Sequence, residues 1–340
     1  MRAINLTGST GRPSKGIDLH NTTANLRFVL NKNMGIIRSF GLFLSFATCI
    51  SAVSAAESYV IVDNQTGFLL ASKNRDEKLP IASLTKVATA LVALDWARLK
   101  NADLSVLATV PASAVVEGTA NPVGLQPGDQ MSLRDLIYAS LLASDNVAAA
   151  TLANHVGAQL PNSHGLDPTG NFVAHMNALA RSLAMRRTRF LNPSGIDHTE
   201  DPPPFSTASD MARLVRYAYD QAGFAFYVAQ PSRQIHVIRG GVDNPFDIGN
   251  TNELLGQEGI DGVKTGRTRL AGDCLILSSD RSPESRREGE KVMITPRRII
   301  VVMLRSPDRF GEGLALIRQG WGLYDAWAAA GRKVSRSSAL

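Results

Sequence analysis

The sequence offers one pair of side chains suited to nucleophilic chemistry, Ser83 and Lys86, which stand three residues apart. Apolar residues recur at helical spacing from Leu84 to Leu94, which predicts a helix over about 83–98. Side chains at positions i and i+3 are neighbours on a helix, about 5–6 Å apart at Cβ, so the lysine amine lies within reach of the serine hydroxyl. A serine becomes a nucleophile when a base accepts its proton, and lysine serves as that base when its surroundings lower its pKa.

Two further short motifs follow this pair along the chain. Ser144 and Asn146 stand two residues apart in a turn between helical segments, and Lys-Thr-Gly at 264–266 precedes an apolar, strand-like stretch. The three motifs are separated by 61 and 120 residues. No other serine has a lysine three residues on, and Lys-Thr-Gly occurs once. Their order and context, at a helix start, a turn and a strand, favour one assembled site.

In these motifs and their surroundings, the chain resembles the serine-type D-alanyl-D-alanine peptidases, the low-molecular-mass penicillin-binding proteins of peptidase family S11. The resemblance lies in five segments, 80–86, 143–147, 192–195, 251–252 and 262–266, and covers about 57–330. It implies a β-lactamase/DD-peptidase-like fold and a reaction that passes through an acyl-enzyme on a serine.

The resemblance also implies a role for each motif residue. Ser83 is the expected nucleophile, which attacks the carbonyl between two D-alanines, and Lys86 is the expected general base. Ser144 is the alternative acceptor of the serine proton, as a relay, and the choice between the two stays open. Lys264 is expected to supply a positive field that keeps Lys86 neutral and helps to move the Ser144 proton. The backbone N–H groups of Ser83 and Arg267 would form an oxyanion hole.

The residues that the resemblance implies for substrate binding are Asn146, Thr265, Gly266, Arg267 and Thr268. Asn146 would hold a peptide amide of the substrate, and Thr265 with Thr268 would bind its terminal carboxylate. The side chains of Arg267 and Arg269 are further candidates for contact with that carboxylate.

The order of elements predicts the fold class. Two apolar runs at 59–63 and 68–71 predict a hairpin ahead of the first helix. Further helices are predicted at about 132–142, 147–156, 171–185, from a cap at Ser206 or Thr207 to 221, and at 312–329. Strands are predicted at 273–279 and 298–305, with a long solvated hairpin loop at 280–297. We expect an α/β (α+β) unit: an antiparallel sheet from both chain ends, flanked by helices, with an inserted helical lobe.

The beginning of the chain has a separate character. Residues 1–56 hold six basic residues and one acid, which account for most of the net charge of +6. The apolar run 40–53 follows a basic residue and is too short to span a membrane. It predicts a signal peptide at 34–56, cleaved after Ala55 or Ala56, and export to the periplasm.

The predicted domain organisation follows from these segments. Residues 1–33 are expected to be an unstructured extension upstream of a start at Met34; the alternative is a start at Met1, with these residues as a long n-region of the signal peptide. Residues 57–330 would form a single DD-peptidase domain, followed by a frayed tail at 331–340. No C-terminal β-rich domain and no stable membrane anchor are expected after the closing helix. The mature chain would hold one thiol, Cys274, buried as a small hydrophobe.

Other functions are disfavoured. Because the basic charge belongs mainly to the leader, no nucleic-acid partner is predicted. The six histidines show no ligand-like clustering, so neither a metal nor a cofactor is expected. A class A β-lactamase needs a glutamate for deacylation, and residues 187–191 ahead of Asn192 contain no acid. A non-catalytic cell-wall binding module is disfavoured because every motif position is intact.

The reaction subtype stays open between two members of the same class. We favour a D-Ala-D-Ala carboxypeptidase that trims peptidoglycan stem peptides and is inhibited covalently by β-lactam antibiotics. The alternative is a D,D-endopeptidase that cleaves peptidoglycan crosslinks, because the short chain resembles that soluble branch. The motifs do not separate the two, since they share the nucleophile and differ in the leaving amine.

Overall fold

The computed structural model describes residues 54–197, 203–221, 223–288, 291–335 and 338–340, which belong to one compact unit. The expected extension at 1–33 and the signal peptide, apart from its last three residues, lie outside the described residues. Among the described helices, none combines the length and the apolar character that crossing a membrane requires.

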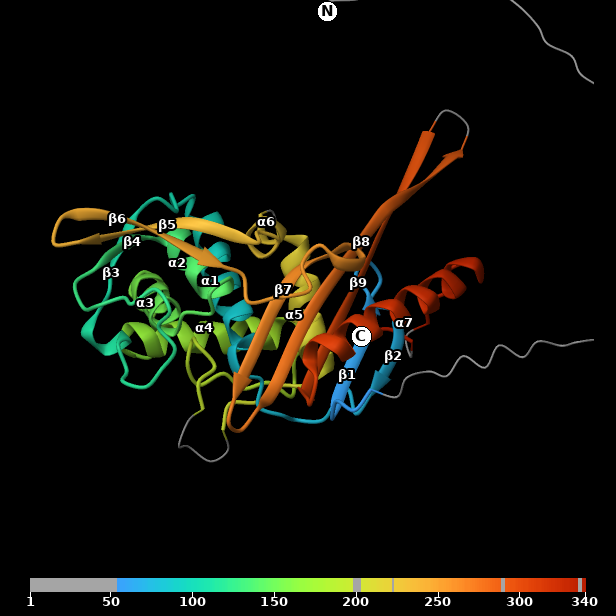
Figure 1. The fold of residues 1–340 in the computed structure, drawn as a ribbon, viewed down its shortest axis with the longest axis horizontal. Coiled ribbons are helices and arrows are strands. Elements are labelled where there is room, and N and C mark those ends of the chain that lie inside the picture. Colours follow the sequence, from blue (N-terminus) through green and yellow to red (C-terminus); the bar gives the residue numbers. More distant parts are fainter. Residues whose placement is uncertain (1–53, 198–202, 222, 289–290, 336–337) are drawn as a thin grey trace, which may run out of the picture. The chain divides into compact units, whose positions relative to one another are not determined.

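An antiparallel sheet forms the centre of the fold (Figure 1). In spatial order its strands are β2 (Leu69–Lys73), β1 (Ser58–Asp63), β9 (Lys291–Ser306), β8 (Gly272–Glu288) and β7 (Ile260–Thr268). The N-terminal hairpin therefore pairs with strands from the C-terminal third, and β7 is the edge strand. This confirms the predicted sheet from both chain ends.

Each face of this sheet lies against a different apolar cluster, because side chains alternate along a strand. On β9, Ile299, Val301 and Met303 pack with residues of the closing helix α7 (Arg309–Ala329), such as Trp321. The residues between them face the larger core that contains the helical lobe. The continuous apolar run at 299–304 is thus explained by a strand that is covered on both faces.

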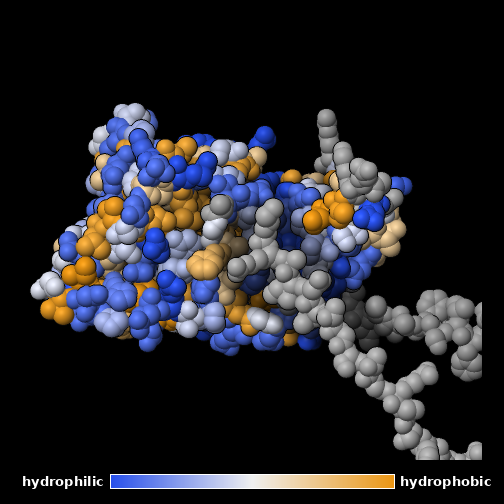
Figure 2. Space-filling model, turned by 90° about the horizontal axis from the view of Figure 1, so that it is seen from above, coloured by the Kyte–Doolittle hydropathy of each residue, from blue (hydrophilic) through white to orange (hydrophobic). Residues whose placement is uncertain are grey.

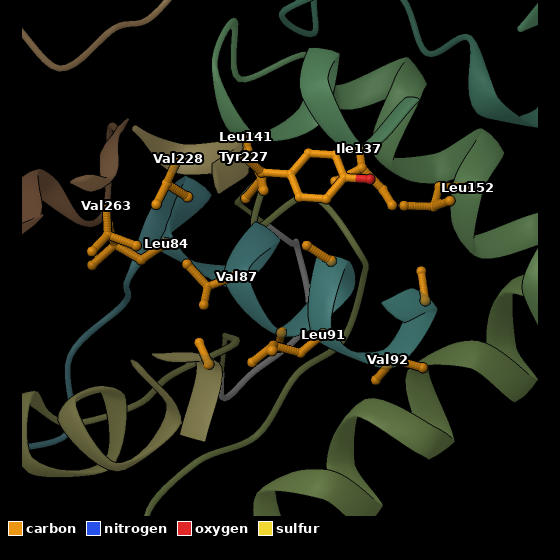
Figure 3. Packing of buried hydrophobic residues seen from close by; sticks show 14 of the residues in the cluster. Leu84, Val87, Leu91, Val92, Ile137, Leu141, Leu152, Tyr227, Val228 and Val263 are labelled. Atoms are coloured by element: carbon orange, nitrogen blue, oxygen red, sulfur yellow. The ribbon is translucent and has the colours of Figure 1, made fainter. Parts of the chain in front are cut away.

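The helical lobe lies between β2 and β7 in the sequence. Its helices are α1 (Lys86–Lys100), α2 (Leu133–Leu141), α3 (Asn146–Gly157), α4 (Pro168–Ser182), α5 (Ala208–Asp220) and α6 (Phe224–Val228). A short 3-10 turn, η1 (Ala82–Thr85), precedes α1. Figure 3 shows Leu84, Val87 and Leu91 packed within this lobe, together with Ile137 and Tyr227. The predicted helices are confirmed in type and nearly in length.

A second sheet was not anticipated from the sequence. It contains β3 (Leu107–Thr109), β4 (Gln130–Ser132), β5 (Ser232–Arg239) and β6 (Val242–Gly249). In the β5–β6 hairpin only Ile235, Val237 and Ile248 are buried. Because buried apolar residues are so few in this hairpin, its sequence lacks the alternating pattern that predicts a strand. The remaining short turns are η2 (Ala112–Ala114) and η3 (Gln257–Gly259).

The predicted loop at 280–297 is wrong. Strands β8 and β9 continue through it as a two-stranded ribbon that extends beyond the other strands (Figure 1). Arg281 and Arg297 both pair with Asp325 of α7 and lie over the Trp321 ring, which fixes the base of the ribbon. Charged residues and two prolines concealed the strand pattern in the sequence. The contact with α7, which the local sequence does not reveal, stabilises these strands.

The frayed tail also needs correction. The backbone N–H of Leu69 donates to Ser338 O at 2.8 Å, and that of Leu340 donates to Gly67 O at 3.0 Å. The last residues therefore lie along the β1–β2 turn, and the Leu340 side chain reaches the larger core.

Cys274 is buried as a free thiol, as predicted. Hydrophilic side chains cover most of the face in Figure 2, with apolar ones in separate patches.

Candidate active site

The site lies in a cleft of about 730 Å³ between the helical lobe and the edge strand β7. It brings together residues from all three sequence motifs, with Ser83, Ser144, Asn146, Thr265 and Gly266 in its lining. Residues as far apart in sequence as Ser83 and Gly266, 183 positions, thus share one cavity, as the motif order predicted.

Two glycines permit the close approach that shapes the cleft. A Cβ on Gly266 would lie 3.1 Å from the Ala82 Cβ and 3.2 Å from the Ser83 backbone nitrogen, so β7 passes directly against the nucleophile turn. Gly195 has φ +79°, and a Cβ there would lie 1.9 Å from the Ala82 carbonyl oxygen. A side chain does not fit at Gly195, and at Gly266 even a Cβ would press against the nucleophile turn.

Lys86 is fully buried and has three partners. Its Nζ lies 2.8 Å from Ser83 Oγ, 2.6 Å from Asn146 Oδ1 and 2.8 Å from the Ser194 carbonyl oxygen. A neutral amine has two N–H groups and one lone pair. Because the two carbonyl oxygens can only accept hydrogen bonds, they take both N–H groups, and the lone pair is directed at the serine hydroxyl. This arrangement suits a general base.

The Ser194 carbonyl group is held in place by polar contacts of its turn. The turn 192–195 is fixed by Asn192 Oδ1, which accepts from the N–H groups of Ser194 at 3.1 Å and Gly195 at 2.6 Å. Thr89, one turn of α1 beyond Lys86, donates from Oγ1 to Pro193 O at 2.6 Å. The family signature at 192–195, to which we had assigned no role, thus supplies a partner of the base.

Burial sets the protonation of this lysine. Desolvation lowers the pKa of the Lys86 amine to about 7, and the charge of Asp145 opposes this shift. Asp145 is itself buried as the N-cap of α3, where it accepts from Ala148 N at 2.8 Å, and desolvation raises its pKa. We expected the field of Lys264 to keep Lys86 neutral, but burial is the leading cause.

Lys264 is 1% exposed and donates from Nζ to Thr265 O at 3.1 Å. Desolvation lowers its pKa well below the usual value, and the charges of Lys86 and Arg309 lower it further. Two buried lysines in one site disfavour each other's protonation. At most a small share of molecules then carries both charges near neutral pH.

Ser144 adopts φ +60° in the turn between α2 and α3, which turns its side chain into the cleft. Among the described residues, no hydrogen bond joins its hydroxyl to Lys86 or Lys264. The direct contact of Lys86 with Ser83 makes the lysine the better-placed acceptor of the nucleophile's proton. Asn146 is 8% exposed, and its side-chain carbonyl oxygen accepts a hydrogen bond from Lys86, a contact that we did not foresee.

The candidate substrate-binding residues on β7 differ in their hydrogen-bond partners and in their exposure. Thr265 Oγ1 lies 2.7 Å from Thr251 Oγ1 inside the cleft, and Thr268 Oγ1 accepts from Ala271 N at 3.1 Å in the β7–β8 turn. The Arg267 side chain is 70% exposed and pairs with Asp273. Thr265, Arg267 and Thr268 all line the cleft, but the Arg267 guanidinium is already paired with Asp273.

Arg309 is a cleft residue that sequence reasoning missed. It begins α7, is largely buried, and lies 3.2 Å from Asp273 Oδ1 and 3.4 Å from the Gly266 carbonyl oxygen. It places a guanidinium beside the Lys-Thr-Gly segment, where we had considered Arg267 and Arg269. No local motif marks it, because it lies 43 residues beyond Gly266.

Comparison with known proteins identifies the family. A family model described as D-alanyl-D-alanine carboxypeptidase matches residues 47–287, more than half of the chain. The chain belongs to this family. A D-alanyl-D-alanine endopeptidase from Pseudomonas aeruginosa is 31% identical over 270 residues, which are 74% of this chain and 80% of that protein. The D-alanyl-D-alanine carboxypeptidase DacF from Bacillus subtilis is 30% identical over 230 residues, which are 66% of this chain and 54% of that protein. This chain therefore spans only about half the length of that carboxypeptidase.

Solved structures of DD-peptidases share the fold. The Streptomyces K15 DD-transpeptidase has a TM-score of 0.68 and 26% identity, covering 79% of this chain and 98% of that one. Penicillin-binding protein D2 from Listeria monocytogenes, in an ampicillin-bound form, has a TM-score of 0.63 and 25% identity over 79% of this chain and 99% of that one. The expected family and fold are confirmed. Within the described residues of this DD-peptidase, no group of three or more His, Cys, Asp or Glu side chains is arranged so that it could bind a metal ion.

The pKa of Lys86 predicts the pH dependence of the reaction. Because the base must be neutral, kcat/KM should fall about tenfold per pH unit below pH 7 and level off above it. Rates of Ser83 acylation between pH 5 and 9 measure this. Asp145→Asn keeps the helix cap but removes the charge that raises the Lys86 pKa, so its midpoint should move to lower pH. A flat profile would contradict Lys86 as the base.

Thr89 should act as a positioning residue. Thr89→Val removes the hydrogen bond to Pro193 O and should lower kcat/KM about fivefold, since one buried hydrogen bond is worth roughly 1 kcal/mol. Thr151→Val is the matched control, because its buried Oγ1 on α3 has no partner within the described residues. The control should acylate as fast as wild type. Equal rates in both variants would show that the turn holds its place without Thr89.

Proposed function

We propose that this DD-peptidase is a serine-type D-Ala-D-Ala carboxypeptidase that removes the terminal D-alanine from peptidoglycan stem peptides. The observation that carries the proposal is the contact of Ser83 Oγ with the buried Lys86 amine, whose pKa is lowered to about 7. A serine beside a neutral amine in an open cleft is equipped for acyl transfer. Membership of the D-alanyl-D-alanine carboxypeptidase family supports the D-alanyl peptide as the substrate.

In the proposed reaction, Ser83 Oγ attacks the carbonyl carbon between the two D-alanines and its proton passes to Lys86. The backbone N–H groups of Ser83 and Arg267 stabilise the oxyanion. Lys86 then gives its proton to the departing amine of D-alanine. Water releases the acyl group from Ser83, and the same lysine accepts the water's proton. Ser144 remains a candidate relay, and Lys264 assists through its charge when protonated.

The edge position of β7 supports binding of an extended peptide. The outer edge of β7 faces the cleft and pairs with no strand of the described sheet. Edge strands accept an added strand through their backbone groups. A stem peptide would lie along this edge, with Asn146 at its amide and Thr265 and Thr268 near its terminal carboxylate. Arg309 would supply the charge that this carboxylate requires.

We further propose that the chain is exported to the periplasm, where its peptidoglycan substrate lies, and that penicillins acylate Ser83. The first proposal rests on the apolar run at 40–53. The second is supported by the ampicillin-bound relative from Listeria monocytogenes. Because no acid precedes Asn192 at 187–191, release of the penicilloyl group would be slow.

A D,D-endopeptidase acting on peptidoglycan crosslinks is the second candidate. The Pseudomonas aeruginosa relative bears that name, and this chain covers 80% of it. The corresponding share of the Bacillus subtilis carboxypeptidase is 54%. Both reactions use the same acyl-enzyme, so the leaving amine alone separates them.

Incubation with two purified peptidoglycan fragments tests the proposal. An uncrosslinked pentapeptide should lose one alanine by mass, while a crosslinked dimer stays intact. Conversion of dimer to monomers would instead establish the endopeptidase. Ser83→Ala should turn over neither substrate and bind no penicillin covalently. If Ser83→Ala cleaves either fragment, the nucleophile is another group.

Arg309 should set the preference for a free carboxylate. Wild type should hydrolyse a peptide ending in D-Ala-D-Ala at least about tenfold faster, in kcat/KM, than the same peptide with a C-terminal amide, since a charge-assisted hydrogen bond is worth about 1.5–3 kcal/mol. Arg309→Leu should bring this ratio close to one, and Arg267→Leu, whose side chain is exposed, should preserve it. An unchanged ratio in Arg309→Leu would remove this role.

A further inference from the structure

Two of the three residues before Glu57, Ser54 and Ala56, are held in a specific socket. Ala56 is fully buried in the apolar cluster between the sheet and α7. Its backbone N–H donates to Glu312 Oε2 at 2.9 Å, and its carbonyl oxygen accepts from Lys73 Nζ at 2.8 Å. The Ser54 hydroxyl also donates to Glu312 Oε2, at 2.7 Å. Methyl, N–H and carbonyl of Ala56 are therefore all engaged.

This socket distinguishes the two cleavage positions that the sequence left open. Cleavage after Ala56 would empty it and leave the Glu312 carboxylate without the N–H that it now binds. Cleavage after Ala55 would remove Ser54 and its hydrogen bond to Glu312, but it would keep Ala56 in place and turn that N–H into an ammonium group. Glu312 is partly buried, and a partly buried carboxylate is stabilised more by a cation than by a neutral donor.

We propose that the leader is removed between Ala55 and Ala56 and that the new ammonium group of Ala56 pairs with Glu312. A leader-removing peptidase would hydrolyse the Ala55–Ala56 bond with one water molecule, giving a carboxylate on Ala55 and an ammonium on Ala56. Ala56 is then the first residue of the folded domain, and its ammonium group, just before β1, forms an ion pair with Glu312 in the first turn of α7. The inference rests on the proposed export and is independent of the proposed reaction.

The charged groups around the new terminus fix the sign of its pH dependence. Glu312 faces the nitrogen from α7, Lys73 faces the carbonyl oxygen from β2, and Glu57 is paired with Arg305 of β9 at 2.8 Å. An α-amino group has a pKa of about 7.7–8.0 in an unfolded chain, and the carboxylate raises it in the folded state. The stabilisation is therefore full below pH 7.7 and is lost as pH rises through the folded value.

The first test is the mass and N-terminal sequence of the full chain after secretion from a bacterium. The proposal expects a chain that starts at Ala56. A chain that starts at Glu57, starts earlier than Ala56, or keeps its leader overturns it. This readout needs no variant and no activity assay, so it stands whether or not the protein proves to be a carboxypeptidase.

The second test is thermal unfolding of the secreted protein at pH 6.5 and pH 10.5. Glu312→Gln keeps an acceptor but removes the charge, so it should lower the Tm by a few degrees at pH 6.5 and by much less at pH 10.5. Glu253→Gln is the matched control, an exposed carboxylate without an ion pair within the described residues, and should leave both values unchanged. A Glu312→Gln deficit that is equal at both pH values would show that no ammonium pairs there.

Discussion

The site depends on one buried amine that is surrounded by acceptors. Lys86 Nζ meets two carbonyl oxygens and the Ser83 hydroxyl within 2.6–2.8 Å, and burial lowers its pKa to about 7. Because burial disfavours the charged amine while its acceptors and Asp145 favour it, Lys86 can both accept and return a proton near neutral pH. Because its acceptors come from α3 and from the turn at 192–195, the base is formed only when α1, α3 and that turn pack together.

The sheet completes what the helical lobe begins. Strand β7 passes against the nucleophile turn because Gly266 has no side chain, and it leaves an open edge along the cleft. The α7 helix, which covers one face of the same sheet, starts with Arg309 at the cleft wall. A sheet composed of both chain ends thus closes the cleft across the inserted lobe. Ser83 and the guanidinium of Arg309 therefore reach the cleft from separate parts of the fold.

The same α7 helix also ties down the margins of the sheet. Its aromatic face holds the base of the β8–β9 ribbon through Arg281 and Arg297, and its first turn holds the backbone of Ala56 through Glu312. The last residues of the chain lie along the β1–β2 turn. Isolated hairpins are marginally stable, so these contacts explain why β1, β2 and the ribbon are ordered as strands.

By itself, the sequence determined the chemistry and the main elements: spacing brought Ser83 and Lys86 onto one helix start, and apolar periodicity gave the helices and the sheet of both chain ends. These signals are local or follow strict motifs. Only the tertiary structure decided the carbonyl partners of Lys86, the place of Arg309 and the ribbon at 280–297. Backbone acceptors carry no side-chain signature, Arg309 is distant from every motif, and the ribbon's strands are fixed by packing on α7. Contacts between residues far apart in sequence leave no periodic pattern, and so they became visible only in the folded chain.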